Sequence, residues 1–285
     1  MRPVKIFADS TCDLSPEIIK KYDVKIIPLF VSLGDKAYLD GLEICPADIF
    51  KYYNETKQLP KTSAVPVDAY EKAFKSAVEE GFDVVHFTIS SEFSACYQNA
   101  CIAAEEVGHV WPVDSRNLST GIGILVLMAA ELAAKGESAE QIAEHVRSAT
   151  GRVDTSFVID KLEFLHKGGR CSGVAALGAN VLKLKPCIEV TGGKMVVGKK
   201  YRGSFEKVVK EYVRERLEGN NDIDLDRIFV TSTGVDPKFQ KEVAKEVKSC
   251  LPFKEILITE AGSTITGHCG PGTLGVIYIR KNEKS

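Results

Sequence analysis

The chain has 285 residues, of which 44% are hydrophobic and 27% are charged, which is an ordinary globular composition. This composition excludes a disordered chain, and the length is enough for about two domains. The 37 Lys and Arg residues face 39 Asp and Glu residues, so the net charge is -2. No overall positive field is available to hold a phosphate backbone, and we expect no nucleic-acid partner.

The eight cysteines show neither a C-x-x-C pair nor zinc-finger spacing with histidines. Charges at Arg2, Lys5 and Asp9 interrupt any apolar leader, so we expect reduced thiols in the cytoplasm. The uncharged stretch over residues 118–130 is 13 residues long, short of the roughly 20 that span a bilayer. It predicts a buried helix and no membrane span.

Strand and helix patterns alternate along the first part of the chain. Ser15 before Pro16 marks a helix start, and Ser138 with Gln141 forms a capping box. This alternation predicts a parallel sheet with helices on both faces. Strands are expected over residues 4–8, 25–33, 37–39, 83–89 and 109–113, with helices over 47–54, 67–80, 94–107 and 118–134.

The second part of the chain has a different pattern. Gly192-Gly193 lies between two strand-like runs and indicates a hairpin. A mixed-sheet α/β domain is predicted, with the boundary near Thr150-Gly151, so that the domains cover residues 1–150 and 151–285. Strands are expected over residues 157–159, 187–190, 195–201, 227–231, 255–259 and 274–279, with helices over 162–167, 205–217 and 238–248.

Hydroxyl side chains follow several of the predicted strands, where ligands bind in open α/β sheets. Together they suggest a polar head group held by neutral donors, but serine and threonine also cap helices. For Thr62 and Ser94 both interpretations stay open. The loops are Asp9-Ser10-Thr11, Thr62-Ser63, Ser90-Ser91 with Ser94, and Asp114-Ser115.

The other motifs in the sequence do not indicate a nucleotide, metal or catalytic site. The glycines of residues 270–275 match G-x-G-x-x-G, but a strand rather than a helix follows them, which excludes a dinucleotide site. No phosphate loop, nucleophile elbow or H-E-x-x-H is present, and we expect no metal or cofactor. His268 beside this loop could orient a ligand or be structural. Arg170 after two glycines could meet an anion or a partner, or simply be solvated.

An ordered set of motifs resembles the DegV family over nearly the whole chain. Two segments depart from the usual family motifs: Ala95-Cys96 replaces the usual Gly-Thr, and Ala64-Val65-Pro66 lacks the usual glutamine. The matching segments are Asp9-Ser10-Thr11-Cys12-Asp13-Leu14, Thr62-Ser63 before Pro66, Ser90-Ser91 through Gln98, Val113-Asp114-Ser115, Gly168-Gly169-Arg170-Cys171-Ser172, Leu184-Lys185-Pro186 and His268-Cys269-Gly270-Pro271-Gly272.

This resemblance implies a two-domain α/β protein that binds one long-chain fatty acid between its domains. It implies that Thr62, Ser63, Ser94 and His268 form the polar network around the carboxylate. Such proteins are similar to the lipid-carrying subunit of bacterial fatty acid kinase, whose separate ATP-binding subunit makes the acyl phosphate. By the same resemblance Arg170 and Arg202 dock the kinase, and the chain has no catalytic site of its own.

Two other functions remain as alternatives. The chain could be a small-molecule hydrolase that uses a loop serine, although no base lies near Ser94 in the sequence. A nucleotide-binding domain is the third possibility, and it lacks a phosphate loop.

Overall fold

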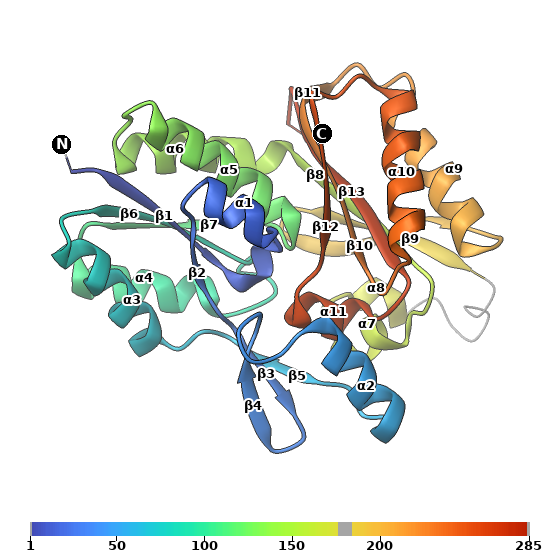
Figure 1. Ribbon diagram of the computed structural model, residues 1–285, viewed down its shortest axis with the longest axis horizontal. Coiled ribbons are helices and arrows are strands. Elements are labelled where there is room, and N and C mark those ends of the chain that lie inside the picture. Colours follow the sequence, from blue (N-terminus) through green and yellow to red (C-terminus); the bar gives the residue numbers. More distant parts are fainter. Residues whose placement is uncertain (1, 176–183, 284–285) are drawn as a thin grey trace.

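The first part of the chain builds a four-stranded parallel sheet in the computed structural model, which describes residues 2–175 and 184–283. The strand order is β2-β1-β6-β7, with helices above and below (Figure 1). Both faces are covered, and β1 and β6 are accordingly apolar along most of their length. The strands are β1 (Val4–Asp9), β2 (Lys25–Ile27), β6 (Asp83–Thr88) and β7 (Val110–Asp114).

Helices lie on both faces of this parallel sheet. The side chain of Ser15 caps the first helix, and Ser138 forms the predicted capping box with Gln141. The helices α3 and α4 cover one face, and α5 and α6 cover the other (Figure 1). Their bounds are α1 (Pro16–Lys21), α3 (Val67–Glu79), α4 (Cys96–Val107), α5 (Thr120–Ala134) and α6 (Ala139–Ala149).

The predicted strand over residues 25–33 is divided in the structure. Pro28 cannot donate to a ladder, and the chain leaves the parallel sheet there. The remainder joins a small antiparallel sheet of order β4-β3-β5, beside which α2 lies (Figure 1). The bounds are β3 (Phe30–Leu33), β4 (Lys36–Leu39), β5 (Lys61–Ser63) and α2 (Pro46–Thr56).

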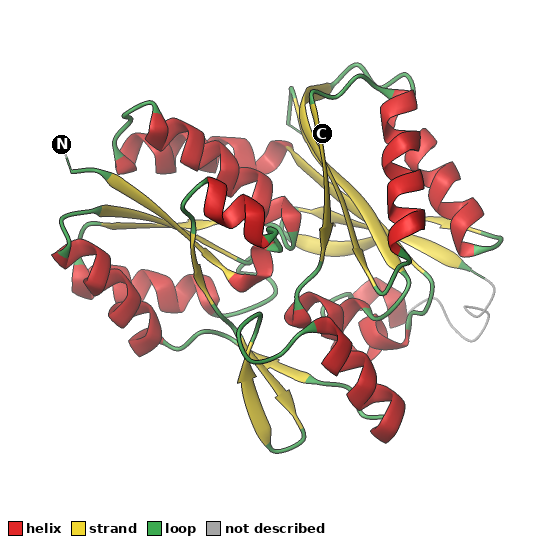
Figure 2. Cartoon of the chain, in the orientation of Figure 1, coloured by secondary structure: helices red, strands yellow, loops and turns green. Residues whose placement is uncertain are grey.

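The second part of the chain forms the predicted mixed sheet (Figure 2). Its strand order is β10-β9-β8-β13-β11-β12. All neighbours are antiparallel except β11 and β12, which are parallel. The strand expected over 157–159 begins four residues earlier. The strands are β8 (Val153–Ile159), β9 (Lys185–Thr191), β10 (Lys194–Tyr201), β11 (Ile223–Thr233), β12 (Glu255–Glu260) and β13 (Thr273–Arg280).

Helices α9 and α10 cover one face of the mixed sheet, and α5 packs against the other face. Since α5 lies between the two large sheets, it is apolar nearly all round. The short helix α11 was not among the predicted elements. The bounds are α7 (Glu163–Gly168), α8 (Ser172–Ala175), α9 (Phe205–Leu217), α10 (Pro237–Cys250) and α11 (Ser263–Cys269), with 3-10 turns η1 (Ser10–Cys12) and η2 (Thr150–Arg152).

Segments from before the predicted boundary lie beside elements that follow it. α2 and β5 contact α11, so the small sheet bridges the two parts of the chain (Figure 1). The division at Thr150-Gly151 stays a prediction.

Candidate functional site

A cavity of about 280 Å³ lies where the small sheet, α11 and the loop after β6 meet. Two of the predicted hydroxyl loops reach it, one through Thr62 and Ser63 and the other through Ser94. The remaining wall is mostly apolar, so the cavity has a polar part and a larger apolar part. Its lining is Leu29, Thr62, Ser63, Ala64, Ile89, Phe93, Ser94, Ala95, Leu118, Arg170, Met195, Thr264, Ile265, His268 and Cys269.

Thr62 and His268 meet at the polar end of this cavity. The distance between Thr62 Oγ1 and His268 Nε2 is 2.9 Å. Burial, together with the positive charge of Arg170, lowers the pKa of His268 to about 4, so the imidazole is neutral at pH 7. With its proton on Nε2, His268 donates to Thr62 and leaves the Thr62 hydroxyl proton free for a ligand.

The sequence pattern suggested that His268 lies beside a glycine loop, whereas in the structure His268 lies on α11. The other ring nitrogen, Nδ1, packs against Gly168, where a Cβ would lie 2.7 Å away. This contact explains a glycine at position 168. Among the described residues Nδ1 has no hydrogen-bond partner, so no acidic group orients the ring.

Ser94 contributes a second hydroxyl to the cavity. Its Oγ donates to Cys96 Sγ over 3.1 Å and accepts from the Cys96 backbone N–H over 3.3 Å. Burial raises the pKa of Cys96 to about 12, so it stays a neutral thiol. Sulfur is a weak acceptor, and the Ser94 proton can turn to a carboxylate instead. Cys96, which replaces the threonine usual in the family motif, thus contacts the Ser94 hydroxyl directly.

Two aspartates from the first part of the chain hold the amino end of α11. Asp13 Oδ1 accepts from the Gly262 N–H over 2.9 Å. Asp40 accepts from the N–H groups of Ser263 and Thr264 over 2.8 and 3.3 Å. These bonds satisfy amides that a helix start leaves unpaired, and they fix the helix that carries His268.

The Asp13 carboxyl is expected to make the stability of the protein depend on pH. Burial, reinforced by nearby Asp40, raises its pKa to about 8, whereas the unfolded value is near 3.8. Between these values the folded state binds the extra proton, so the free energy of unfolding should fall as pH rises from about 4 to 8. We expect Asp13→Asn, which keeps one acceptor and one donor, to remove more than about 1 kcal/mol of this dependence.

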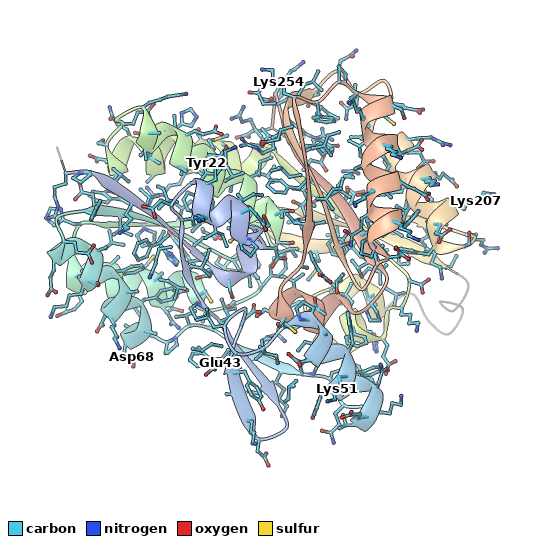
Figure 3. All side chains as sticks on the ribbon, in the orientation of Figure 1. Tyr22, Glu43, Lys51, Asp68, Lys207 and Lys254 are labelled. Carbon is cyan, nitrogen blue, oxygen red and sulfur yellow. The ribbon has the colours of Figure 1, made fainter. Side chains whose placement is uncertain are left out.

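The measurement is urea unfolding at pH 5 and pH 9. Asp68→Asn on the exposed surface of α3 is the matched control, and it should keep the dependence of the parent (Figure 3). The same pH dependence in Asp13→Asn and in the parent would contradict the assignment to Asp13.

The remaining predicted site residues are on the surface. Ser63 is exposed and lines the cavity mouth. Arg170 is exposed at the rim, where its Nη1 donates to the Gly168 carbonyl over 2.8 Å. Arg202 is exposed just after β10 and does not line the cavity.

A second chamber of about 30 Å³ lies behind Leu118, Ile265 and Cys269, which line both spaces. It lies between the start of α5 and the inner face of the mixed sheet. Two of its threonine hydroxyls bond to threonines outside the lining: Thr231 to Thr120 and Thr259, and Thr233 to Thr266. Among the described residues, the Thr155 and Ser232 hydroxyls have no hydrogen-bond partner. The additional lining residues are Ser119, Thr155, Phe157, Thr231, Ser232, Thr233, Ala261, Thr273, Gly275 and Ile277.

The sequence did not single out the apolar wall. Met195 on β10 and Ile265 on α11 line the cavity because of where the β9–β10 hairpin and α11 lie in the fold, which their local sequence does not indicate. The aspartates of two strand-end loops are engaged in hydrogen bonds away from the cavity: Asp9 accepts from Tyr70 and Ile89, and Asp114 accepts from Ser91. Over residues 2–175 and 184–283, no three His, Cys, Asp or Glu side chains gather to hold a metal.

No helix in the same ranges is long and apolar enough to cross a membrane.

The family model described as "Uncharacterised protein, DegV family" matches residues 3–281. The chain belongs to the DegV family. A DegV domain-containing protein of Clostridium perfringens is 34% identical over 99% of this chain and 100% of its own length. A protein of Thermotoga maritima called a fatty acid-binding protein is 29% identical, over 95% of this chain and 96% of its own length.

Solved structures of DegV proteins share the fold. A Thermus thermophilus DegV protein described for its fatty acid binding has a TM-score of 0.88 and 32% identity, covering 98% of this chain and 100% of its own. A stearic acid-binding protein of Eubacterium ventriosum has a TM-score of 0.85 and 30% identity, covering 98% of both chains. These likenesses confirm the predicted combination of a parallel sheet with a mixed sheet.

Proposed function

We propose that this DegV protein binds one long-chain fatty acid and works as a carrier in the cytoplasm. The carboxylate would lie at Thr62 and Ser94, with Ser63 at the mouth and His268 behind Thr62. The tail would pass Cys269 into the second chamber. The observation that carries this proposal is a single cavity that combines the neutral donors Thr62, Ser94 and His268 with a mostly apolar wall.

The tail supplies most of the affinity in this proposal. Each buried methylene contributes about 0.8 kcal/mol, so a tail of about 16 carbons supplies on the order of 12 kcal/mol before ordering costs. The head-group donors then need only orient the carboxylate. Passage of such a tail requires Leu118, Ile265 and Cys269 to give way between the two chambers.

Neutral donors suit a carboxylate that must react later. A bidentate arginine would hold the carboxylate firmly and neutralise its charge. Here Arg170 lies at the rim with one of its nitrogens already donating to Gly168. We therefore propose that the chain presents its fatty acid to a separate ATP-binding kinase subunit, which forms the acyl phosphate.

The hydrolase alternative has weaker support. Ser94 contacts a thiol rather than a base, and His268 contacts Thr62. An imidazole with a pKa of about 4 is a poor general base at pH 7, and no acid orients it within the described residues. We propose that the chain has no chemistry of its own.

The test is turnover by the purified chain supplied with ATP and a fatty acid. We expect neither ADP nor acyl phosphate until a kinase subunit is added. Steady ATP hydrolysis by the chain alone, abolished by one substitution within it, would contradict the carrier function.

Arg170→Ala should separate docking from lipid binding. If Arg170 meets the kinase, kinase-dependent phosphorylation should slow by about tenfold, the cost of one well-placed interfacial charge, while fatty-acid affinity changes little. Arg202→Ala should act in the same direction. Lys207→Ala, exposed on α9, is the matched control (Figure 3). Equal losses of affinity and phosphorylation in Arg170→Ala would mean that it holds the ligand or the fold.

A further inference from the structure

The strand β12 forms an open edge of the mixed sheet. It pairs with β11 on one side only. Within the described ranges, the outward-facing backbone groups of residues 255–260 have no hydrogen-bond partner. The strand carries no proline, lysine or arginine, which are the usual protections of such an edge, and Ile258 is 38% exposed.

A groove of about 330 Å³ runs between this edge and α10. Phe253 and Ile256 provide its apolar surface, and Ala244 on α10 leaves space for it. Three lysines line it, Lys245 and Lys248 on α10 and Lys254 just before β12. Figure 3 labels Lys254.

The charges on α10 are divided between its two sides. Glu242 pairs with Lys210, and Glu246 pairs with Arg214, so the acids of α10 are turned toward α9. Lys245 and Lys248 have no ion pair within the part of the chain that the structure describes. Lys254 pairs with Asp226 over 2.5 Å. The positive charge that remains available beside β12 is therefore that of Lys245 and Lys248, although the chain carries a net charge of -2.

We propose that β12 takes up an extended acidic segment of a partner protein as an additional strand. The partner's backbone would pair with the open edge. Its side chains on the α10 side would lie beside Ile256 and Ile258, within reach of Lys245 and Lys248. Alternating apolar and acidic residues fit this surface, because the pleat directs every second side chain to the same face.

A second copy of this chain fits the edge less well. Two β12 strands paired antiparallel at this edge are related by a two-fold axis perpendicular to the sheet, so the α10 sides of both copies lie on the same face of the joined sheet. Lys245 and Lys248 of the two copies would then face each other across the pair and repel.

The probe is a labelled, end-blocked peptide of alternating valine and glutamate, measured by fluorescence anisotropy. We expect the double variant Lys245→Glu/Lys248→Glu to bind this peptide about tenfold or more weakly than the parent chain. Lys238→Glu with Lys241→Glu is the matched control, since it makes the same change on α10 outside the groove lining, and its effect should be smaller. A peptide with alternate residues N-methylated should not bind, and hydrogen exchange in β12 should slow on binding.

Four results would overturn the proposal. The first is that the peptide does not bind at millimolar concentration, and the second is that the N-methylated peptide binds equally well. The third is a concentration-dependent dimer of the chain that Ile258→Lys abolishes. The fourth is that the peptide does not bind, whereas phosphatidylglycerol vesicles bind and require Lys245 and Lys248. The last two would assign the surface to a second copy or to a lipid surface. Fatty-acid binding, measured on the same samples, should not change in any of the lysine variants.

Discussion

Removing the Thr62 or the Ser94 hydroxyl is expected to weaken fatty-acid binding strongly. Thr62→Val and Ser94→Ala each delete one hydrogen bond to a charged group, worth about 1.5–3 kcal/mol. Each variant should therefore bind about 10- to 150-fold more weakly. The double variant should lose more than either single one, but the two losses need not add because both hydroxyls serve one carboxylate.

Binding isotherms with palmitate and with its methyl ester measure this effect. The ester cannot offer a carboxylate, so its weaker binding should be affected less by either substitution. Ser91→Ala is the control, because Ser91 lies on the same loop but bonds to Asp114 outside the cavity. Palmitate affinity unchanged in both Thr62→Val and Ser94→Ala would contradict the head-group assignment.

Filling the second chamber should shorten the fatty acid that the protein prefers. Ala261 lines this chamber only, and Ala261→Leu adds three carbon atoms there. If about three methylenes of the tail are displaced, the loss is about 2.4 kcal/mol, or about 50-fold in affinity. Fatty acids too short to reach the chamber should bind as before.

The measurement is a series of isotherms with saturated fatty acids of increasing length. Urea unfolding must accompany it, because overpacking costs typically 1–3 kcal/mol of stability. A uniform loss of affinity at every chain length would point to general damage. No loss for the longest acids would mean that the tail follows a different path.

Much of the fold could be predicted because its signals are local. Ser15 and Ser138 cap helices as expected, and Gly192-Gly193 turns the β9–β10 hairpin with both glycines at positive φ. The alternation of strand and helix up to Ala149 gives a parallel sheet because such strands need crossover helices. These features depend on neighbours in the sequence.

The helix α11 could not be predicted in the same way. Its residues, Ser-Thr-Ile-Thr-Gly-His-Cys, are mostly weak helix formers. Asp13 and Asp40 stabilise its start, and both are more than 200 residues away in the chain. A helix held by tertiary contacts leaves little local signal, which is why His268 was placed in a loop.

The candidate site shows the same limit. Thr62 and His268 are 206 positions apart, and no spacing rule brings them together. Residue chemistry alone left helix capping as an alternative for the hydroxyls. In the structure Thr62 lies in β5 and caps no helix, whereas Ser94 does accept the first amide of α4. The family resemblance named both residues, and in the structure both line the same cavity.

The most direct test of the carrier function is mass spectrometry of the purified protein after denaturation, followed by titration of the delipidated chain with palmitate. We predict one long-chain fatty acid released per chain, and one saturable site whose affinity falls in Thr62→Val and Ser94→Ala. A chain that releases no fatty acid and binds none after delipidation, while still folded, would contradict the account.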